Sequence, residues 1–522
     1  MNAAQRTLRN VRRSGSRGTR EVQRWGRRAQ REARHLFLRA RREVRPLERE
    51  LRAFPRRASR TSQAWLVDAG RDLRHGDLRA VALLLLVVTF ALLPLQNVRL
   101  TAGVAVADLV LVVAAGVALV SRHERPKSSP LPALVRNGIV LMALGGFVGL
   151  VFADEAVVSA KLLVRLLAVA ALAAVAIIRV APSGREARRL LVAFVVVGAI
   201  SGLVSALGDV TGAPFLDRST FGDRAVGLTV VPYPLLDYFR GTTAAAESIA
   251  TNPNLFGGVS AVGGALAVIL LIEATGWRAR LVLGAAAAGL FLGVLFSGSR
   301  SALLALLVGC VPAVWRLIRR GFGRHVLIGA GIVTAMVVLS LFTTVRAPSL
   351  DRLLLREGSA DSERTAESTI LRYQNATRGL EARGWHSLAT GSGLRDDAPS
   401  KLHDGHLEIW VGLGLIGLAG WALLCFGVIE GGVRYAGRAG PLRAHEVALL
   451  ALGSAFAANV VVTLFVDTIW NRYIWLLVAL AVSLLIRPYG VETAPAPAGA
   501  GRTPLPRDPD RPDRPEHELV PA

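Results

Sequence analysis

Charged residues are scarce in this 522-residue chain, at 19% against 52% hydrophobic residues. Soluble domains average about 25% charged residues, and the apolar content is far too high for a disordered chain. The only cysteines, Cys310 and Cys425, both lie in apolar stretches, which excludes a disulfide framework, a CxxC motif and a cysteine zinc cluster. Lysine is almost absent, with three residues against 59 arginines, so arginine abundance alone says little about function. These absences leave an integral membrane protein with charged tails.

Long apolar runs fill the middle of the chain. A helix needs about 20 mostly apolar residues to cross the hydrocarbon core. Twelve stretches are of this kind: 80–97, 101–121, 134–153, 157–179, 189–209, 254–273, 280–297, 301–317, 325–345, 406–428, 446–466 and 470–486. We therefore predict an all-α integral membrane protein with about twelve transmembrane helices, a count that the tight junctions at 297–301 and 467–470 leave open by one or two.

Basic residues in the short connections predict the orientation. With the N-terminus in the cytoplasm, the inner connections hold twelve Arg or Lys, whereas the short outer connections hold only Arg99 and Arg300. Both termini are therefore predicted to be cytoplasmic. The inner connections are 122–133, 180–188, 274–279, 318–324 and 429–445.

Two charged tails flank the predicted membrane domain, 80–486. Residues 1–79 hold 23 Arg and 8 Asp or Glu, and no short apolar region with a cleavage site precedes the first span, so they are not a secretory signal. Apolar residues at helical spacing from Trp25 to Phe54 favour a basic amphipathic helix on the anionic inner leaflet; a solvated tail that sets topology is the alternative. No recognised nucleic-acid-binding fold accompanies the charge. Residues 487–522 hold nine prolines and read as a disordered tail.

Two long connections, 210–253 and 346–405, are predicted to lie outside. The second separates the ninth and tenth predicted helices and carries nine basic and nine acidic residues. Its stretch Ser362–Trp385 has helical spacing of apolar residues. Connections of this length are usually functional or disordered, and the Trp, Tyr and Gly content of this one favours an ordered, partly helical loop.

A polar segment with two histidines enters the tenth predicted helix. His403, His406 and Glu408 stand just before the glycine-rich run Gly414-Leu-Ile-Gly417. Histidine donates or accepts protons near neutral pH, so the segment is a candidate for chemistry at the outer surface. An interfacial histidine without a chemical role is the alternative.

Two other outer segments contain an arginine, and the position of one of them suits phosphate. Arg300 ends the run Phe296-Ser-Gly-Ser-Arg300 between two spans, where its fork could bind phosphate or anchor the helix at the interface. Arg224 lies in the first outer loop. The loop ends in Asn252-Pro253-Asn254, which is a turn and helix-start signal.

Three of the charged residues inside predicted spans are candidates for a buried site. Asp108 lies in the second, and Lys161 and Arg165 lie one turn apart in the fourth. Ionisable residues at membrane depth are costly and often functional. They predict either an internal ion pair or a cavity that binds an anion.

Four of these segments, in this order, resemble the O-antigen ligase and polymerase superfamily of polytopic glycan transferases. They are Arg224 to Asn254, Ser297 to Arg300, Arg372-Tyr-Gln-Asn-Ala through Gly391-Ser-Gly393, and the histidine segment. The resemblance covers about residues 80–486.

The histidine segment departs from the family at two positions. The family pattern resembles His-Asn-x-aromatic-Leu-Glu followed by Gly-Leu-Ile-Gly, which places His403 at its histidine. Asp404 replaces the usual Asn and His406 stands where an aromatic residue is common, so a shared role for His406 stays open. The insertion Val230–Ala250 separates Arg224 from Asn254 by more than is usual.

The resemblance implies a reaction on the outer side of the bacterial cytoplasmic membrane. A glycan passes from a polyprenyl pyrophosphate carrier to an acceptor hydroxyl on a glycan, a lipid or a protein. It implies His403 as general base and Arg300 and Arg224 as pyrophosphate ligands, with Arg372, Glu408, His406, Lys161 and Arg165 as secondary candidates. No Asp-x-Asp motif stands in the outer loops, so metal-independent, inverting transfer without a cofactor is expected. Ligase and polymerase activity differ in the acceptor, which the sequence does not name.

Other protein classes match less well. Twelve spans with inner termini suit a secondary transporter or an exporter of lipid-linked glycans, but such a transporter often has a long inner connection after the sixth span. Here that connection is the short 274–279, and no internal repeat is evident. A glycosyltransferase with an acidic metal site in its first outer loop needs more than residues 98–100. A non-catalytic scaffold has no need for Arg and His gathered on one side.

Overall fold

The computed structural model describes residues 77–94, 105–121, 129–211, 253–297, 299–323, 374, 377–381, 383–395, 404–466 and 471–486. Within these ranges the regular secondary structure is helical, without strands. The helices are α2 Leu78–Leu92, α3 Val106–Val120, α4 Ala133–Val151, α5 Ala156–Val180, α6 Gly184–Thr211, α8 Pro253–Ile272, α9 Trp277–Phe296, α10 Arg300–Arg319, α14 Ser387–Thr390, α15 Gly405–Val433, α16 Ala444–Thr463 and α17 Arg472–Leu485. Residues 1–76, the predicted span 325–345 and the tail 487–522 lie outside the described residues.

Eight described helices are long and apolar enough to cross a membrane: α4, α5, α6, α8, α9, α10, α15 and α16. Three more, α2, α3 and α17, are apolar but have only 14 or 15 residues. Eleven of the twelve predicted stretches thus coincide with apolar helices. The chain is an α-helical, multi-pass membrane protein, while the predicted count of about twelve spans is not confirmed.

Several helices extend into the predicted inner connections. Helix α6 begins at Gly184 and α9 at Trp277, so Arg185, Arg188 and Arg278 lie in helices rather than in loops. The sequence predicted these helix boundaries from hydropathy, which falls at the first arginine of each helix. A helix continues past that point because the apolar stem of arginine lies along the helix while its guanidinium reaches water.

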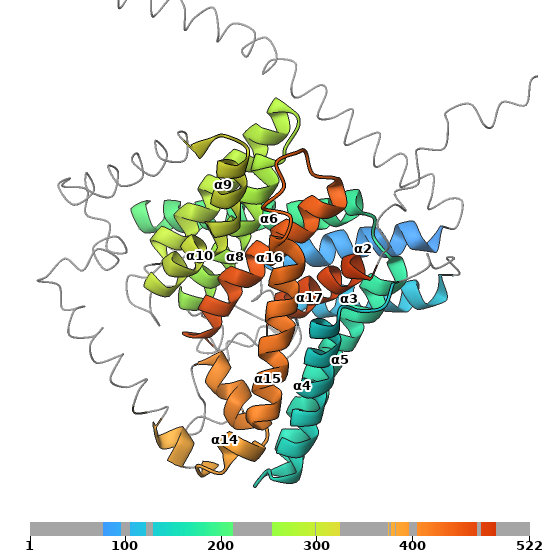
Figure 1. The fold of residues 1–522 in the computed structure, drawn as a ribbon, viewed down its shortest axis with the longest axis vertical. Helices are drawn as coiled ribbons and strands as arrows, with labels where there is room; N and C mark the ends of the chain where they lie inside the picture. Colours follow the sequence, from blue (N-terminus) through green and yellow to red (C-terminus); the bar gives the residue numbers. More distant parts are fainter. Residues whose placement is uncertain are drawn as a thin grey trace, which may run out of the picture. The chain divides into compact units, whose positions relative to one another are not determined.

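Helix α4 lies directly against α15 through glycines (Figure 1). A Cβ atom added at Gly145 would stand 2.5 Å from the backbone nitrogen of Gly417, and one at Gly138 would stand 2.8 Å from the carbonyl oxygen of Gly420. Small residues let two backbones approach closely, which drives helix association in a bilayer where apolar side chains gain little from leaving lipid. This glycine seam fixes α15 along α4.

A second group of helices surrounds α16. Helices α6, α8, α9 and α10 pack against one another, and α16 contacts α6, α8, α10 and α15 (Figure 1). Helix α16 is almost wholly enclosed by the other helices, since 89% of its most apolar 18-residue stretch is buried. It therefore connects the α4–α15 pair with the other helices.

Contacts between helix ends fall into two sets. At the first, which we call the Glu273 end, Glu273 after α8 pairs with Arg316 of α10 at 2.9 Å and with Arg320, directly after α10, at 2.6 Å. Arg79 of α2 pairs with Glu186 of α6 at 2.8 Å in the same set of predicted inner ends.

The second set, which we call the α14 end, joins the start of α15 to α14, to the segment 391–395 and to the connection between α4 and α5. The ion pairs and hydrogen bonds of both sets connect helix ends that the sequence predicts on a common side.

Candidate functional site

An N-cap aspartate fixes the start of α15. The Asp404 carboxylate accepts hydrogen bonds from the backbone N–H groups of His406 at 2.9 Å and Leu407 at 3.0 Å. Asp and Asn are about equally good at this position because both offer an acceptor oxygen, so an Asn at position 404 would make the same cap. Burial raises the pKa of Asp404, an effect opposed by the hydrogen bonds from these two amides. His403 directly precedes the cap and lies outside the described residues.

A buried ion pair joins the predicted outer loop to α15. Arg383 Nη2 lies 3.2 Å from Glu408 Oε2, and both residues are 1% exposed. Glu408, a secondary candidate, thus has a clear structural task in the first turn of α15. Arg383 was not predicted, although an ionised glutamate at the start of an apolar helix requires a cationic partner when it is buried.

The motif Gly391-Ser392-Gly393 lies along α15. The N–H of Ser392 donates to the Val411 carbonyl at 2.9 Å and that of Gly393 to the Gly412 carbonyl at 3.1 Å. Both carbonyls stand just before Gly414, whose φ of 69° interrupts the helix. The φ values of Gly391 and Gly393 are 83° and 79°, which favour glycine. This segment is thereby held against the first three turns of α15.

The same segment reaches the connection between α4 and α5. The Ser159 hydroxyl of α5 donates to the Leu394 carbonyl at 3.0 Å, and Arg395 Nη2 donates to Asp154 at 2.7 Å. Trp410 Nε1 donates to the Leu388 carbonyl of α14 at 2.8 Å. The first turns of α15 and the segment 391–395 are therefore fastened to α14, to α5 and to the connection between α4 and α5.

His406 is fully engaged through both ring nitrogens. Trp421 Nε1 donates to His406 Nδ1 at 3.1 Å, which makes Nδ1 the acceptor, because indole can only donate. Nε2 then carries the proton and donates to the Val460 carbonyl of α16 at 2.9 Å. These contacts describe a ring fixed at both nitrogens, at the position where the pattern that the segment resembles has an aromatic residue. They favour that interpretation over a role in the chemistry.

The Ser-x-Ser-Arg junction presents Arg300 at the start of α10. Ser297 and Ser299 are buried, and the Ser299 hydroxyl caps α10 by accepting from the Ala302 N–H at 3.4 Å. Arg300 is exposed and makes no ion pair within the described residues. The N-terminus of a helix carries partial positive charge, so a cation there lacks the compensation that an anion would bring.

Contacts through α16 connect this junction with the histidine segment. A Cβ at Gly257 of α8 would stand 2.5 Å from Ser297 Oγ, and one at Gly258 would stand 2.5 Å from Val462 of α16. Two residues before Val462 in the same helix, the Val460 carbonyl accepts the hydrogen bond from His406. Helix α8 begins at Pro253, as Asn-Pro-Asn predicted. The starts of α8, α10 and α15 therefore belong to one connected region.

The three charges singled out inside predicted spans divide into one ion pair and two exposed side chains. Asp108 forms an ion pair with Arg472, between the starts of α3 and α17. Lys161 and Arg165 are exposed on α5 rather than interior, and neither has an ion-pair partner among the described residues. Both point away from the packed face of α5, where long side chains can reach the interface.

Arg224, Arg372 and His403 lie outside the described residues, so their distances from this region are not defined. In the described part of the chain, no group of three or more His, Cys, Asp or Glu residues is placed to hold a metal ion.

No known family model matches the chain, and no similar sequence is found among curated proteins.

Proposed function

We propose that the chain transfers a glycan from a polyprenyl pyrophosphate carrier to an acceptor hydroxyl, at the α14 end, on the outer side of a bacterial cytoplasmic membrane. The observation that carries the proposal is the connected region just described. In this region, parts of three of the four motif segments lie at neighbouring helix starts. They are the histidine segment, the Gly-Ser-Gly segment and the Ser-x-Ser-Arg junction.

The reaction follows from the chemistry of these groups. The acceptor oxygen forms a bond to the anomeric carbon, and the bond from that carbon to the phosphate oxygen breaks, so that the pyrophosphate leaves with the electron pair. His403 takes the acceptor's proton as general base. Arg300 and Arg224 stabilise the charge that develops on the leaving group. Inversion without a metal ion is the expected course.

The position of Arg300 at the start of α10 supports its assignment as a pyrophosphate ligand, because a cation is unfavourable there. A cation in the first turn of a helix is unfavourable by about 0.3–1 kcal/mol relative to a neutral residue. Arg300 has no ion-pair partner in the described residues to offset that cost. A pyrophosphate would supply the missing negative charge, and the fork of arginine matches phosphate oxygens.

The fastening of α15 supports the placement of His403. A catalytic group must be held to within about 0.5 Å, by residues whose own positions are fixed. Asp404 caps the helix, and Glu408, one turn on, is clamped by Arg383. This region is therefore rigid where the proposed base enters the membrane domain.

The test is transfer by the purified full chain in lipid nanodiscs, with a lipid-linked glycan donor and separate candidate acceptors. A new glycosidic bond on another lipid-linked glycan means polymerase activity, and one on a lipid, wall polymer or protein means ligase activity. Deletion of the gene should lead to accumulation of lipid-linked glycan. Movement of intact donor across vesicles without bond formation would instead identify an exporter.

The orientation is tested separately with two exposed alanines. Ala389 lies in α14 and Ala439 follows α15 on the predicted inner side. In a chain whose two native cysteines are replaced, Ala389→Cys should react with a membrane-impermeant thiol reagent in intact cells, and Ala439→Cys only after lysis. The reverse pattern would place the α14 end in the cytoplasm and remove the proposal. Ser392 is unsuitable because it is 1% exposed.

A further inference from the structure

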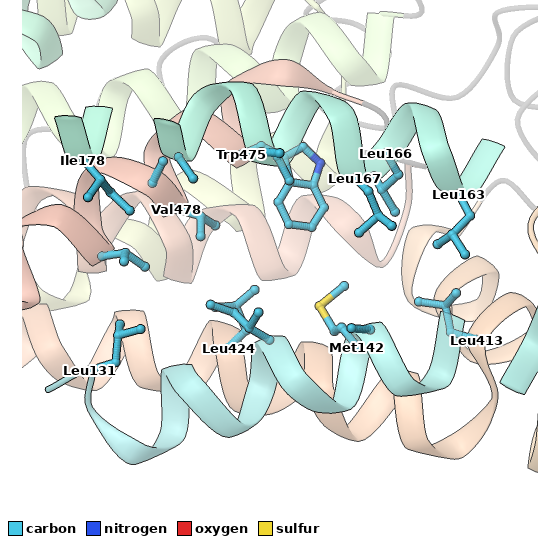
Figure 2. Close-up of a pocket in the computed structure, with 17 residues that line it drawn as sticks. Leu131, Met142, Leu163, Leu166, Leu167, Ile178, Leu413, Leu424, Trp475 and Val478 are labelled. Atoms are coloured by element: carbon cyan, nitrogen blue, oxygen red, sulfur yellow. The ribbon is translucent and has the colours of Figure 1, made fainter. Parts of the chain in front are cut away.

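An apolar groove separates two helices that follow each other in the chain. Helices α4 and α5 are joined by residues 152–155, yet α4 packs mainly on α15, and α5 on α3 and α17. The space left between α4 and α5 has a volume of about 410 Å³. Figure 2 shows Leu166, Leu167 and Trp475 on one side of this space and Met142 and Leu424 on the other.

The lining excludes polar occupants. All 17 residues around the groove are Leu, Ile, Met, Ala, Trp or Val. A pathway for ions or sugars needs polar groups to replace water, so this groove does not suit the transport of such solutes. A hydrocarbon chain is the chemistry that matches it.

The groove has the length of a membrane-embedded chain. Its lining on α5 extends from Leu163 to Ile178. Fifteen residues of helix span about 22 Å, which is most of a hydrocarbon core about 30 Å thick. The occupant therefore lies along the membrane normal rather than across it.

One end of the groove meets the candidate site. Leu163 is one turn from Ser159, which bonds the Leu394 carbonyl, and Leu413 directly precedes the break at Gly414. Arg395, at the end of this segment, is 8% exposed and pairs with Asp154. A chain in the groove thus has its head beside a buried cation and beside the segment that holds the start of α15.

We propose that this groove binds the polyprenyl chain of the donor, so that the pyrophosphate is delivered to the α14 end. The inference rests on the proposed function, since that function requires a polyprenyl-linked donor. A groove that is apolar along its length and ends at the candidate site can anchor a long hydrocarbon chain, while the headgroup of the donor stays at the membrane surface.

The experiment compares donors that carry the same glycan on a long polyprenyl chain and on a chain of two isoprene units. Ala171→Phe and Ala174→Phe fill the groove, whereas Ala168→Phe adds the same bulk to an exposed position of α5 outside it. We expect the groove variants to raise KM for the long donor at least about tenfold, with little change for the short donor. The control variant should resemble the wild type with both. Equal effects on the two donors, or no effect, would overturn the groove assignment while leaving the function intact.

A binding measurement separates this inference from the function itself. A long polyprenyl phosphate carrying a diazirine is photo-crosslinked to the full chain, which needs no turnover. Labelled peptides should come from α4 and α5, and unlabelled polyprenyl phosphate should compete. Even labelling of lipid-facing helices, or equal competition by phospholipid, would show general lipid contact and refute the proposal. Specific labelling without transfer by the wild type would uphold the groove and reject the enzymatic function.

Discussion

The α14 end and the Glu273 end each bury an arginine against a glutamate, but with different surroundings. At the Glu273 end, Arg316 and Arg320 share one carboxylate, and Arg316 also donates to the Gly440 carbonyl. At the α14 end, Arg383 clamps Glu408 in the first turn of α15, next to the motifs. The first cluster joins α8, α10 and the connection after α15, whereas the second fixes the helix start that follows His403. A buried ion pair does not by itself show that the fold is stabilised. We therefore interpret each pair from the elements that it joins.

The largest expected effect concerns His403. His403→Ala should lower kcat by about 10²–10⁴-fold, the usual contribution of a general base, while the amount of folded protein stays normal. His406→Ala is the paired variant, and it should mainly lower the unfolding temperature because it removes the bonds to Trp421 and Val460. Both are assayed for transfer with and without a chelator.

The opposite pattern would contradict the assignment. If only His406→Ala is inactive per folded molecule, the register of the motif is wrong. If a chelator abolishes wild-type activity, His403, Asp404 and His406 become candidates for metal ligands.

The two buried pairs supply the next test. Arg383→Met leaves Glu408 buried without this partner and should cost about 3–5 kcal/mol of stability. Arg316→Met should cost less, because Arg320 Nη2 still lies 2.6 Å from Glu273. Thermal unfolding in detergent measures both.

The conservative variants separate structure from positioning. Arg383→Lys keeps the charge but loses the fork, so we expect a lower kcat per folded molecule with an unchanged KM. Arg316→Lys should leave both parameters unchanged. Equal kcat in the two variants would show that Arg383 is no more than a structural fastening.

Most helices were predictable, because a bilayer forces long apolar runs into helices. The close approach of α4 and α15 was also readable in principle, from Gly145 and Gly149 at a spacing of four. The partner of Glu408 was not readable. Nine basic residues stand in the loop 346–405, and nothing in the sequence distinguishes Arg383 from the other eight.

Two other features needed coordinates for similar reasons. The role of His406 depends on Trp421, 15 residues on, and on Val460 in another helix. The exposure of Lys161 and Arg165 depends on which face of α5 packs, which their spacing of four could not reveal. Sequence reasoning therefore selected segments whose described parts lie at neighbouring helix starts, but it did not predict the contacts that hold them.

Substitutions that remove the charge of Arg300 should lower activity and raise stability. Arg300→Lys keeps the charge without the bidentate fork and should lower kcat/KM, and Arg300→Gln should lower it further, by about tenfold or more, the loss of a charged hydrogen bond. The Gln variant should also gain about 0.3–1 kcal/mol of stability, because a cation leaves the positive end of α10. Arg319, at the other end of α10, is the control, and Arg319→Gln should leave kcat/KM unchanged. Wild-type kcat/KM in Arg300→Gln would exclude Arg300 as a pyrophosphate ligand.

The smallest expected effect concerns the cap itself. Burial raises the pKa of Asp404 above its ordinary value of 3.8. A raised pKa means that the folded state binds the proton more tightly than the unfolded state. The contribution of this proton to the free energy of unfolding is therefore fully present below pH 3.8 and is lost as the pH rises through the pKa of Asp404 in the folded state. At neutral pH the buried charge thus costs stability relative to a neutral acceptor.

Asp404→Asn keeps the acceptor oxygen and removes the charge, so at pH 7 it should unfold at the same or a slightly higher temperature than the wild type. The difference should shrink as the pH falls toward 4, because the wild-type carboxylate then takes up its proton. Asp404→Ala loses the cap and should cost about 1 kcal/mol throughout this range. Unfolding temperatures of the three proteins between pH 4 and pH 8 provide the measurement. If Asn destabilises the chain as much as Ala at pH 7, the charge of the carboxylate rather than its acceptor geometry holds the start of α15, and the equivalence of Asp and Asn at this position fails.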